Sequence, residues 1–100
     1  MRKFRLSAAA DADMRKIAAH TLEHWGKPQR DAYISELFEA FSHLANAPEI
    51  AAKIDNIRNG YRKFPQGSHV IYFRQSDTHA IEIIRVLHTR MDAPAHLTSP

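Results

Sequence analysis

The sequence predicts an α+β domain of two layers, in which a helical hairpin packs on one face of an antiparallel sheet. Three observations lead to this fold class. A short alternating segment comes first, two segments with apolar residues at helical spacing follow, and three segments rich in β-branched and aromatic residues come last. The order is therefore strand, helix, helix, strand, strand, strand. A first strand can rejoin the later sheet, so we expect both helices to cover one face and the other face to stay uncovered.

The chain of 100 residues has the size of one domain. We expect residues 1–97 to form that domain and residues 98–100 to be a disordered tail. The absence of cysteine excludes disulfides, thiolate nucleophiles and cysteine-based zinc sites, and it suits a cytoplasmic location. No apolar run reaches membrane-spanning length, so we expect no membrane partner.

The first half of the chain predicts the opening strand and the hairpin. Residues 3–6 alternate polar and apolar side chains, and Ser7 has the character of a helix N-cap. Apolar residues at helical spacing then run from Met14 to Trp25. Gly26 can supply a left-handed turn, and Pro28 can open a second helix that ends at Asn46-Ala47-Pro48. The very short connection predicts two antiparallel helices packed against each other.

The second half predicts a three-stranded meander after a connector at residues 48–56. Residues 61–64 lead into a tight turn at Pro65-Gln66-Gly67, residues 68–74 form the next strand, and residues 80–88 form the last. The last strand contains the apolar pairs Ile83-Ile84 and Val86-Leu87, which break simple alternation and predict burial on both faces. A short helical turn is expected near residues 95–97.

Positive charge is concentrated in this second half. Residues 1–50 carry seven Lys or Arg against seven Asp or Glu, whereas residues 51–100 carry seven against four. An anionic partner, either RNA or an acidic protein, is therefore plausible on the predicted sheet. A solvated basic face is the simpler interpretation of charge alone.

The residues offer no convincing metal or nucleophile site. His20 and His24 stand four apart on one helix, but they lie off its apolar stripe and read as surface histidines. RNA cleavage is the serious enzymatic alternative, because His69, His88 and His96 with nearby arginines can supply a base, an acid and cations. Arginines also suit the carboxylates of a protein partner, which they bind in a bidentate way. We predict no cofactor.

Five motifs, taken together and in this order, resemble the ParE toxins of type II toxin–antitoxin systems, within the RelE/ParE superfamily. They are Phe4-Arg5-Leu6-Ser7, His24-Trp25-Gly26, Ile57-Arg58-x-Gly60-Tyr61-Arg62, Gly67-Ser68-His69-Val70-Ile71-Tyr72 and Arg85-Val86-Leu87-His88-x-Arg90-Met91-Asp92. The resemblance extends over residues 1–97 without a large insertion and implies the RelE/ParE-like fold.

The resemblance implies a toxin that is neutralised by a ParD-type antitoxin in a hetero-oligomer of 2:2 or higher stoichiometry. Operator DNA would be reached only through the antitoxin. We expect an antitoxin segment to lie along the helical hairpin, with its acidic residues on the arginines. The predicted antitoxin contacts are Trp25, Tyr33, Leu37, Arg58, Tyr61, Arg62 and Arg85.

The resemblance also implies DNA gyrase as the target, inhibited by binding and without an enzymatic reaction, with growth arrest as the outcome. The predicted target contacts are His88, Arg90, Met91, His96 and Leu97. The RelE branch instead cleaves mRNA on the ribosome with a basic cluster and a tyrosine or histidine near the C-terminus. This chain has no tyrosine after Tyr72 and only Lys63 as a lysine in the sheet, which favours ParE, although His96 keeps the alternative open.

Overall fold

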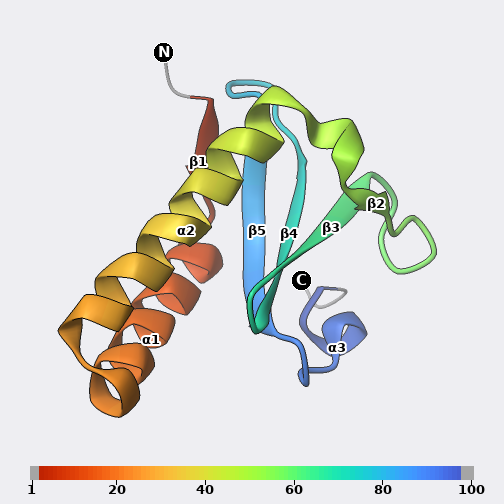
Figure 1. Cartoon of the computed structure of the whole chain (residues 1–100). Helices are drawn as coiled ribbons and strands as arrows, with labels where there is room; N and C mark the ends of the chain where they lie inside the picture. The colour runs from red at the N-terminus through yellow and green to blue at the C-terminus, as the bar shows by residue number, and fades with distance from the viewer. Residues whose placement is uncertain (1–2, 98–100) are drawn as a thin grey trace.

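The computed structural model describes residues 3–97 and confirms the α+β fold with a helical hairpin (Figure 1). Its elements are β1 (Phe4–Leu6), α1 (Ala8–Trp25), α2 (Lys27–Asn46), the 3₁₀ turn η1 (Pro48–Ile50), β2 (Ala52–Lys53), β3 (Tyr61–Gln66), β4 (His69–Gln75), β5 (Ile81–His88) and α3 (Ala93–Leu97). The two long helices lie together on one side of the sheet, and the short α3 lies on the other side. Residues 98–100, expected to be a tail, lie outside the described residues.

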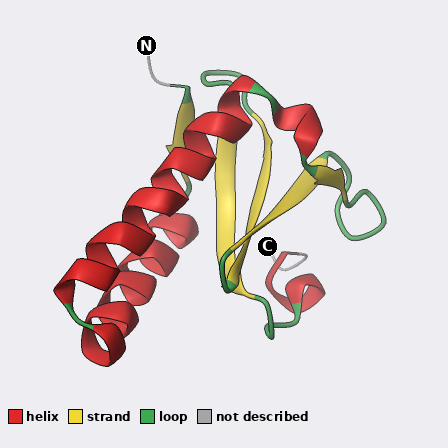
Figure 2. Ribbon diagram, viewed as in Figure 1, coloured by secondary structure: helices red, strands yellow, loops and turns green. Residues whose placement is uncertain are grey.

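The helical hairpin forms as its end signals predict. Ser7 accepts a hydrogen bond from the backbone N–H of Ala10 at 3.0 Å and caps α1. Gly26 joins α1 to α2 alone, with a φ of +88° that favours glycine. The second helix begins at Lys27, so Pro28 stands one position later than predicted, still within the first turn where its missing N–H costs nothing. Figure 2 shows how little loop separates the two helices.

The sheet has the order β1-β5-β4-β3-β2, and the predicted antiparallel pairing needs one correction. β1 pairs with β5 in parallel, while the other neighbours are antiparallel. The reason is the length of α2, whose last residue Asn46 lies 2.7 Å from the ammonium group of Lys3. The chain thus returns to the end of the sheet where β1 starts, so β3 runs in the direction of β1. β4 is antiparallel to β3 and β5 is antiparallel to β4, so β5 also runs in the direction of β1.

The turn between β3 and β4 also differs from the prediction. Pro65 lies within β3, opposite Val70, and Gly67-Ser68 forms the turn. The unpredicted strand β2 pairs only with Arg62 and Lys63, so the β3 edge at Pro65 has no strand neighbour that needs an N–H donor. A proline is tolerated there for that reason.

Two hydrophobic clusters lie on opposite faces of the sheet. The larger one joins the hairpin to the sheet and contains the fully buried Leu37, Phe41 and Ile83. The smaller one contains Ile54, Tyr72, Leu87 and Leu97. The expectation of an uncovered second face is therefore wrong in part, because α3 covers one end of it. Burial of β5 on both faces is confirmed, and a register shift opposite Tyr72/Phe73 lets its side chains pack in both clusters.

Among the described residues, no helix is long and apolar enough to cross a membrane.

Candidate functional site

An open cleft of about 560 Å³ lies where the tip of the helical hairpin approaches the ends of β4 and β5. Trp25, Tyr33 and Met91 contribute apolar surface to it. Its polar lining includes Lys16 and the imidazoles of His20, His69 and His88, and none of the described residues that line it is acidic. The cleft therefore suits an amphipathic and negatively charged ligand.

Tyr33 fixes one wall of the cleft to the β3–β4 turn. Its hydroxyl accepts the backbone N–H of Ser68 at 3.1 Å and lies 2.6 Å from Nδ1 of His69. Burial raises the pKa of Tyr33, so it stays a protonated hydroxyl near neutral pH. The tyrosine ring also packs closely against Gly67, whose φ is +60° and where a Cβ would lie 2.7 Å from Cε1 of Tyr33. Only glycine fits at that position.

Two histidines close the floor of the cleft. The rings of His69 and His88 meet edge to face with centroids 5.5 Å apart, and Nδ1 of His88 accepts the backbone N–H of Arg90 at 3.1 Å. Burial lowers the pKa of His69, and the neighbouring His88 and His20 lower it further. His69 is therefore predominantly neutral at pH 7, and it acts as a hydrogen-bond partner of Tyr33.

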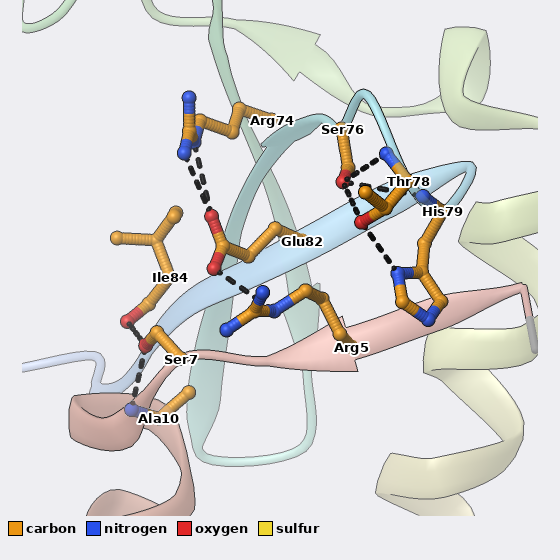
Figure 3. A network of polar contacts seen from close by, with 9 residues as sticks. All are labelled: Arg5, Ser7, Ala10, Arg74, Ser76, Thr78, His79, Glu82 and Ile84. Atoms are coloured by element: carbon orange, nitrogen blue, oxygen red, sulfur yellow. Dashed lines mark hydrogen bonds and ion pairs between the residues drawn. The ribbon is translucent and has the colours of Figure 1, made fainter.

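A second surface is a row of polar side chains that crosses the sheet on the face opposite the hairpin, and Figure 3 shows its members Arg5, Glu82 and Arg74. Arg5 pairs in register with Glu82, Glu82 with Arg74, and Arg74 with Tyr61. Paired residues point to the same side of a sheet, so all four share one face. Glu82 holds both guanidinium groups, with Arg5 Nε at 3.2 Å and Arg74 Nη2 at 2.8 Å. We call these four residues and Arg58, whose guanidinium lies 5.4 Å from the Tyr61 ring centroid, the arginine row.

Comparison with known proteins identifies the family. Residues 4–93 match the family described as "ParE toxin of type II toxin-antitoxin system, parDE". The chain belongs to the ParE toxin family. It is 39% identical to Toxin ParE1 of Mycobacterium tuberculosis over 95 residues, which is 95% of this chain and 97% of the relative. It is also 39% identical to Toxin ParE1 of Caulobacter vibrioides over 97 residues, which is 97% of this chain and 99% of that relative.

Solved structures agree on the ParE fold. A chain of the chromosomal ParDE toxin–antitoxin system from P. aeruginosa superposes with a TM-score of 0.72 at 19% identity, covering 88% of this chain and 96% of that one. A chain of the toxin–antitoxin complex RelBE2 from Mycobacterium tuberculosis gives a TM-score of 0.59 at 24% identity, with 87% and 96% covered. These likenesses concern the fold alone.

The predicted antitoxin contacts of this ParE chain divide between the two surfaces. Trp25, with 72% of its surface exposed, and the half-buried Tyr33 line the cleft. Arg58 and Tyr61 belong to the arginine row, where Nη1 of Arg58 also donates to the carbonyl of Leu97 at 3.1 Å. Arg62 donates to the carbonyl of Ala51 at 2.9 Å on the adjoining edge of the sheet. The fully buried Leu37 offers a partner no surface, so its assignment is corrected to the core.

Arg85 is also corrected, because it holds the fold together. Its Nε and Nη2 donate to the two carboxylate oxygens of Asp13 at 2.7 and 2.9 Å. One of these oxygens also accepts the backbone N–H of Val86 at 3.0 Å. β1 pairs with β5 only as far as Ile83, so beyond this point Asp13 supplies the hydrogen bond that a neighbouring strand would make. The ion pair raises the pKa of Arg85.

The predicted target contacts lie around α3 and the cleft. His88 and the half-exposed Met91 line the cleft, and Arg90 and His96 are exposed. Leu97 is only 3% exposed and packs in the second cluster, so it is corrected to a core residue. Sequence reasoning missed Lys16 in the cleft and Arg5, Arg74 and Glu82 in the arginine row. Their alternation within each strand was visible, but the register that aligns them was not.

Within residues 3–97, no group of three or more metal-ligating side chains is close enough to hold a metal ion. The rings of His20 and His24 lie with centroids 4.1 Å apart on the surface of α1, and Nδ1 of His24 donates to the carbonyl of His20 at 2.9 Å. The two histidines thus make a local contact within α1, as expected for surface residues four apart on a helix.

Proposed function

We propose that this ParE-family toxin is held inactive by a ParD-type antitoxin and, when released, arrests growth by binding DNA gyrase without an enzymatic reaction. Trp25 carries the proposal, because it exposes 72% of its surface beside an open cleft whose lining includes Lys16 and His20. A large exposed aromatic next to an apolar cleft is typical of a protein-binding site. An acidic amphipathic segment of the antitoxin complements both the apolar and the basic parts of this cleft.

Binding of the antitoxin would order a flexible segment, and buried apolar contacts must offset that entropy. Trp25, Met91 and the apolar stem of Lys16 provide such contacts, while the ammonium group of Lys16 is placed to meet a carboxylate. We expect the assembly to be a hetero-oligomer in the cytoplasm, with 2:2 or higher stoichiometry, in which operator DNA is recognised by the antitoxin.

The gyrase contact is assigned to the exposed residues that follow β5. Arg90 and His96 are exposed, and Met91 is half exposed. Truncation after Met91 would remove Leu97 from the second cluster and confuse loss of contact with loss of folding. Single substitutions at Arg90 and His96 are therefore the cleaner probes.

Induced expression with and without the co-expressed antitoxin tests the proposal. We expect growth arrest without it and growth with it. In purified form, Trp25→Ala should weaken antitoxin binding by about tenfold or more, as expected for an aromatic hot spot. Ile50→Ala is the matched control, because Ile50 is 45% exposed and lies outside the residues that line the cleft. Equal loss in both variants would contradict the assignment of the cleft.

A gyrase supercoiling and DNA-cleavage assay, run beside a ribosome-dependent mRNA cleavage assay, distinguishes the two toxin classes. We expect gyrase inhibition with intact mRNA, and reduced inhibition by Arg90→Ala but not by Arg15→Ala on the exposed side of α1. Cleaved mRNA that depends on His96 would overturn the gyrase assignment in favour of a RelE-like endonuclease.

A further inference from the structure

We infer that the arginine row binds the phosphodiester backbone of nucleic acid directly, and that Glu82 is the residue that positions it. The row runs from Arg5 in β1 to Arg74 in β4 and on to Arg58 beside Tyr61, on the face opposite the hairpin. The side chains of Arg5 and Arg74 are 49% and 51% exposed, so solvent reaches both. This contact would be made by the toxin itself, and it differs from the expectation that DNA is reached only through the antitoxin.

The charge around the row is strongly one-sided. Residues 52–75 carry five Lys or Arg against a single acidic residue, Asp55. Asp55 accepts the backbone N–H of Gly60 at 2.8 Å, so its carboxylate is engaged within the loop before β3. Glu82 is the acidic member of the row, and it stands between two arginines, which leaves the row with net positive charge.

The arginines are held in place with donors to spare. A guanidinium carries five N–H groups in a rigid fork that matches phosphate oxygens. Arg74 uses Nε and Nη2 on one oxygen of Glu82, and Arg58 uses Nη1 on the carbonyl of Leu97. The contacts within residues 3–97 thus order each side chain without using all its donors. Such pre-organisation lowers the entropy that binding would otherwise cost.

The end of the row is concave. A hollow of about 430 Å³ is lined by Arg58, Asn59, Gly60, Tyr61, Arg74 and Gln75. It combines two cations, two side-chain amides and an aromatic ring, and none of these lining residues is aliphatic. A flexible acidic peptide needs apolar anchors to offset its ordering, which the cleft offers and this hollow does not. Nucleic acid binds chiefly through its phosphates, which the arginines and side-chain amides of this hollow can contact, so it fits the hollow better.

The length of the row suits this ligand. Neighbouring strands lie about 4.8 Å apart, so the three steps from β1 to β3 span about 14 Å. One strand of duplex DNA presents a phosphate for about every 3.4 Å of rise, or about four phosphates over that distance. Three arginines can therefore meet separate phosphates of one strand.

Fluorescence anisotropy of the full-length toxin with labelled duplex DNA of about 30 base pairs, over a range of salt concentrations, tests the inference. Three phosphate contacts predict a slope of log affinity against log salt of about −2.7. Arg5→Gln or Arg74→Gln should each reduce its magnitude by about 0.9 and weaken binding about eightfold at about 0.1 M salt. Arg15→Gln, which removes the same charge from an exposed ion pair on α1, should leave the slope unchanged.

Glu82→Gln provides a second variant with the opposite expectation. It keeps a side-chain oxygen that can still accept from Arg5 and Arg74 but removes the negative charge from the row, so it should tighten DNA binding several-fold, which loss of folding cannot imitate. Absence of DNA binding at low salt, equal weakening by Arg15→Gln, or weakening by Glu82→Gln would overturn the inference. Competition by polyglutamate as effective as by unlabelled DNA would overturn it in favour of an acidic protein. The growth-arrest assay is separate, so the two proposals can fail independently.

Discussion

Replacing Asp13 with alanine removes the carboxylate that joins α1 to β5. Two partners are lost, namely the bidentate contact with Arg85 and the hydrogen bond from Val86 N–H. The Arg85 side chain is 22% exposed, so water compensates part of the loss, and we assign about 2 kcal/mol to it, below the value for fully buried pairs. The buried N–H of Val86 adds about 1 kcal/mol. The expected cost of about 3 kcal/mol is a large part of the roughly 5–15 kcal/mol that stabilises a domain.

Urea denaturation followed by circular dichroism measures this cost. With an m value near 2 kcal/mol per molar, the midpoint should fall by about 1.5 M. Asp11→Ala is the matched control on the same helix, because Asp11 pairs with Arg15 at the surface, and its loss should cost less than about 0.5 kcal/mol. Asp13→Asn keeps an oxygen for Val86 and should fall between the two. A cost for Asp13→Ala no larger than that of Asp11→Ala would refute the role given to Asp13.

Three further substitutions test the cleft and the second cluster. Tyr33→Phe removes the acceptor of the exposed Ser68 N–H and the contact with Nδ1 of His69. It should cost about 0.5–1.5 kcal/mol in urea denaturation, whereas an unchanged midpoint would contradict these contacts. Burial lowers the pKa of His69, and the neighbouring His88 lowers it further. The unfolded chain therefore binds more protons than the folded chain as the pH falls below about 6.5. Stability from His69 should therefore be full above about pH 6.5 and fall toward pH 5, and His69→Gln should flatten that dependence. Leu97→Ala should cost about 2–4 kcal/mol in thermal unfolding and speed amide exchange in α3, and unchanged exchange would argue against its packing.

Local signals in the sequence were sufficient for the helical hairpin. Apolar residues at helical spacing, the cap at Ser7 and the glycine at position 26 act within one or two turns, so they are readable without the fold. The parallel pairing of β1 and the strand β2 were missed for the opposite reason. The parallel pairing of β1 depends on the length of α2, which sets the end of the sheet at which the next strands begin. Strand β2 has only two residues, too few to show an alternating pattern.

Individual residues of the cleft could be predicted from the sequence, but not that they lie together. Trp25, Tyr33, His88 and Met91 were all chosen, but for two different partners, because nothing in the sequence places the tip of the hairpin beside the end of β5. The 2.6 Å contact between the Tyr33 hydroxyl and Nδ1 of His69, the residue that pairs with His88, shows that placement. The sequence predicts Tyr33 as an antitoxin contact, but not that its hydroxyl also ties α2 to the β3–β4 turn through Ser68 and His69.

The arginines show why accessible charge is a tertiary property. Composition located an excess of cations in the second half, yet it could not separate Arg85, which Asp13 engages, from Arg74, which lies half exposed. Side chains on a strand alternate with period two, and a one-residue irregularity reverses the side of every residue that follows. Glu82 and Val86 are four residues apart, a spacing that in a regular strand places both side chains on one face. The register shift opposite Tyr72/Phe73 lies between them, so Glu82 lies on the face of the arginine row and Val86 on the face of the hairpin. Moving or removing that irregularity would shift Val86 and His88 to the other face, so the register of β5 shapes both candidate surfaces at once.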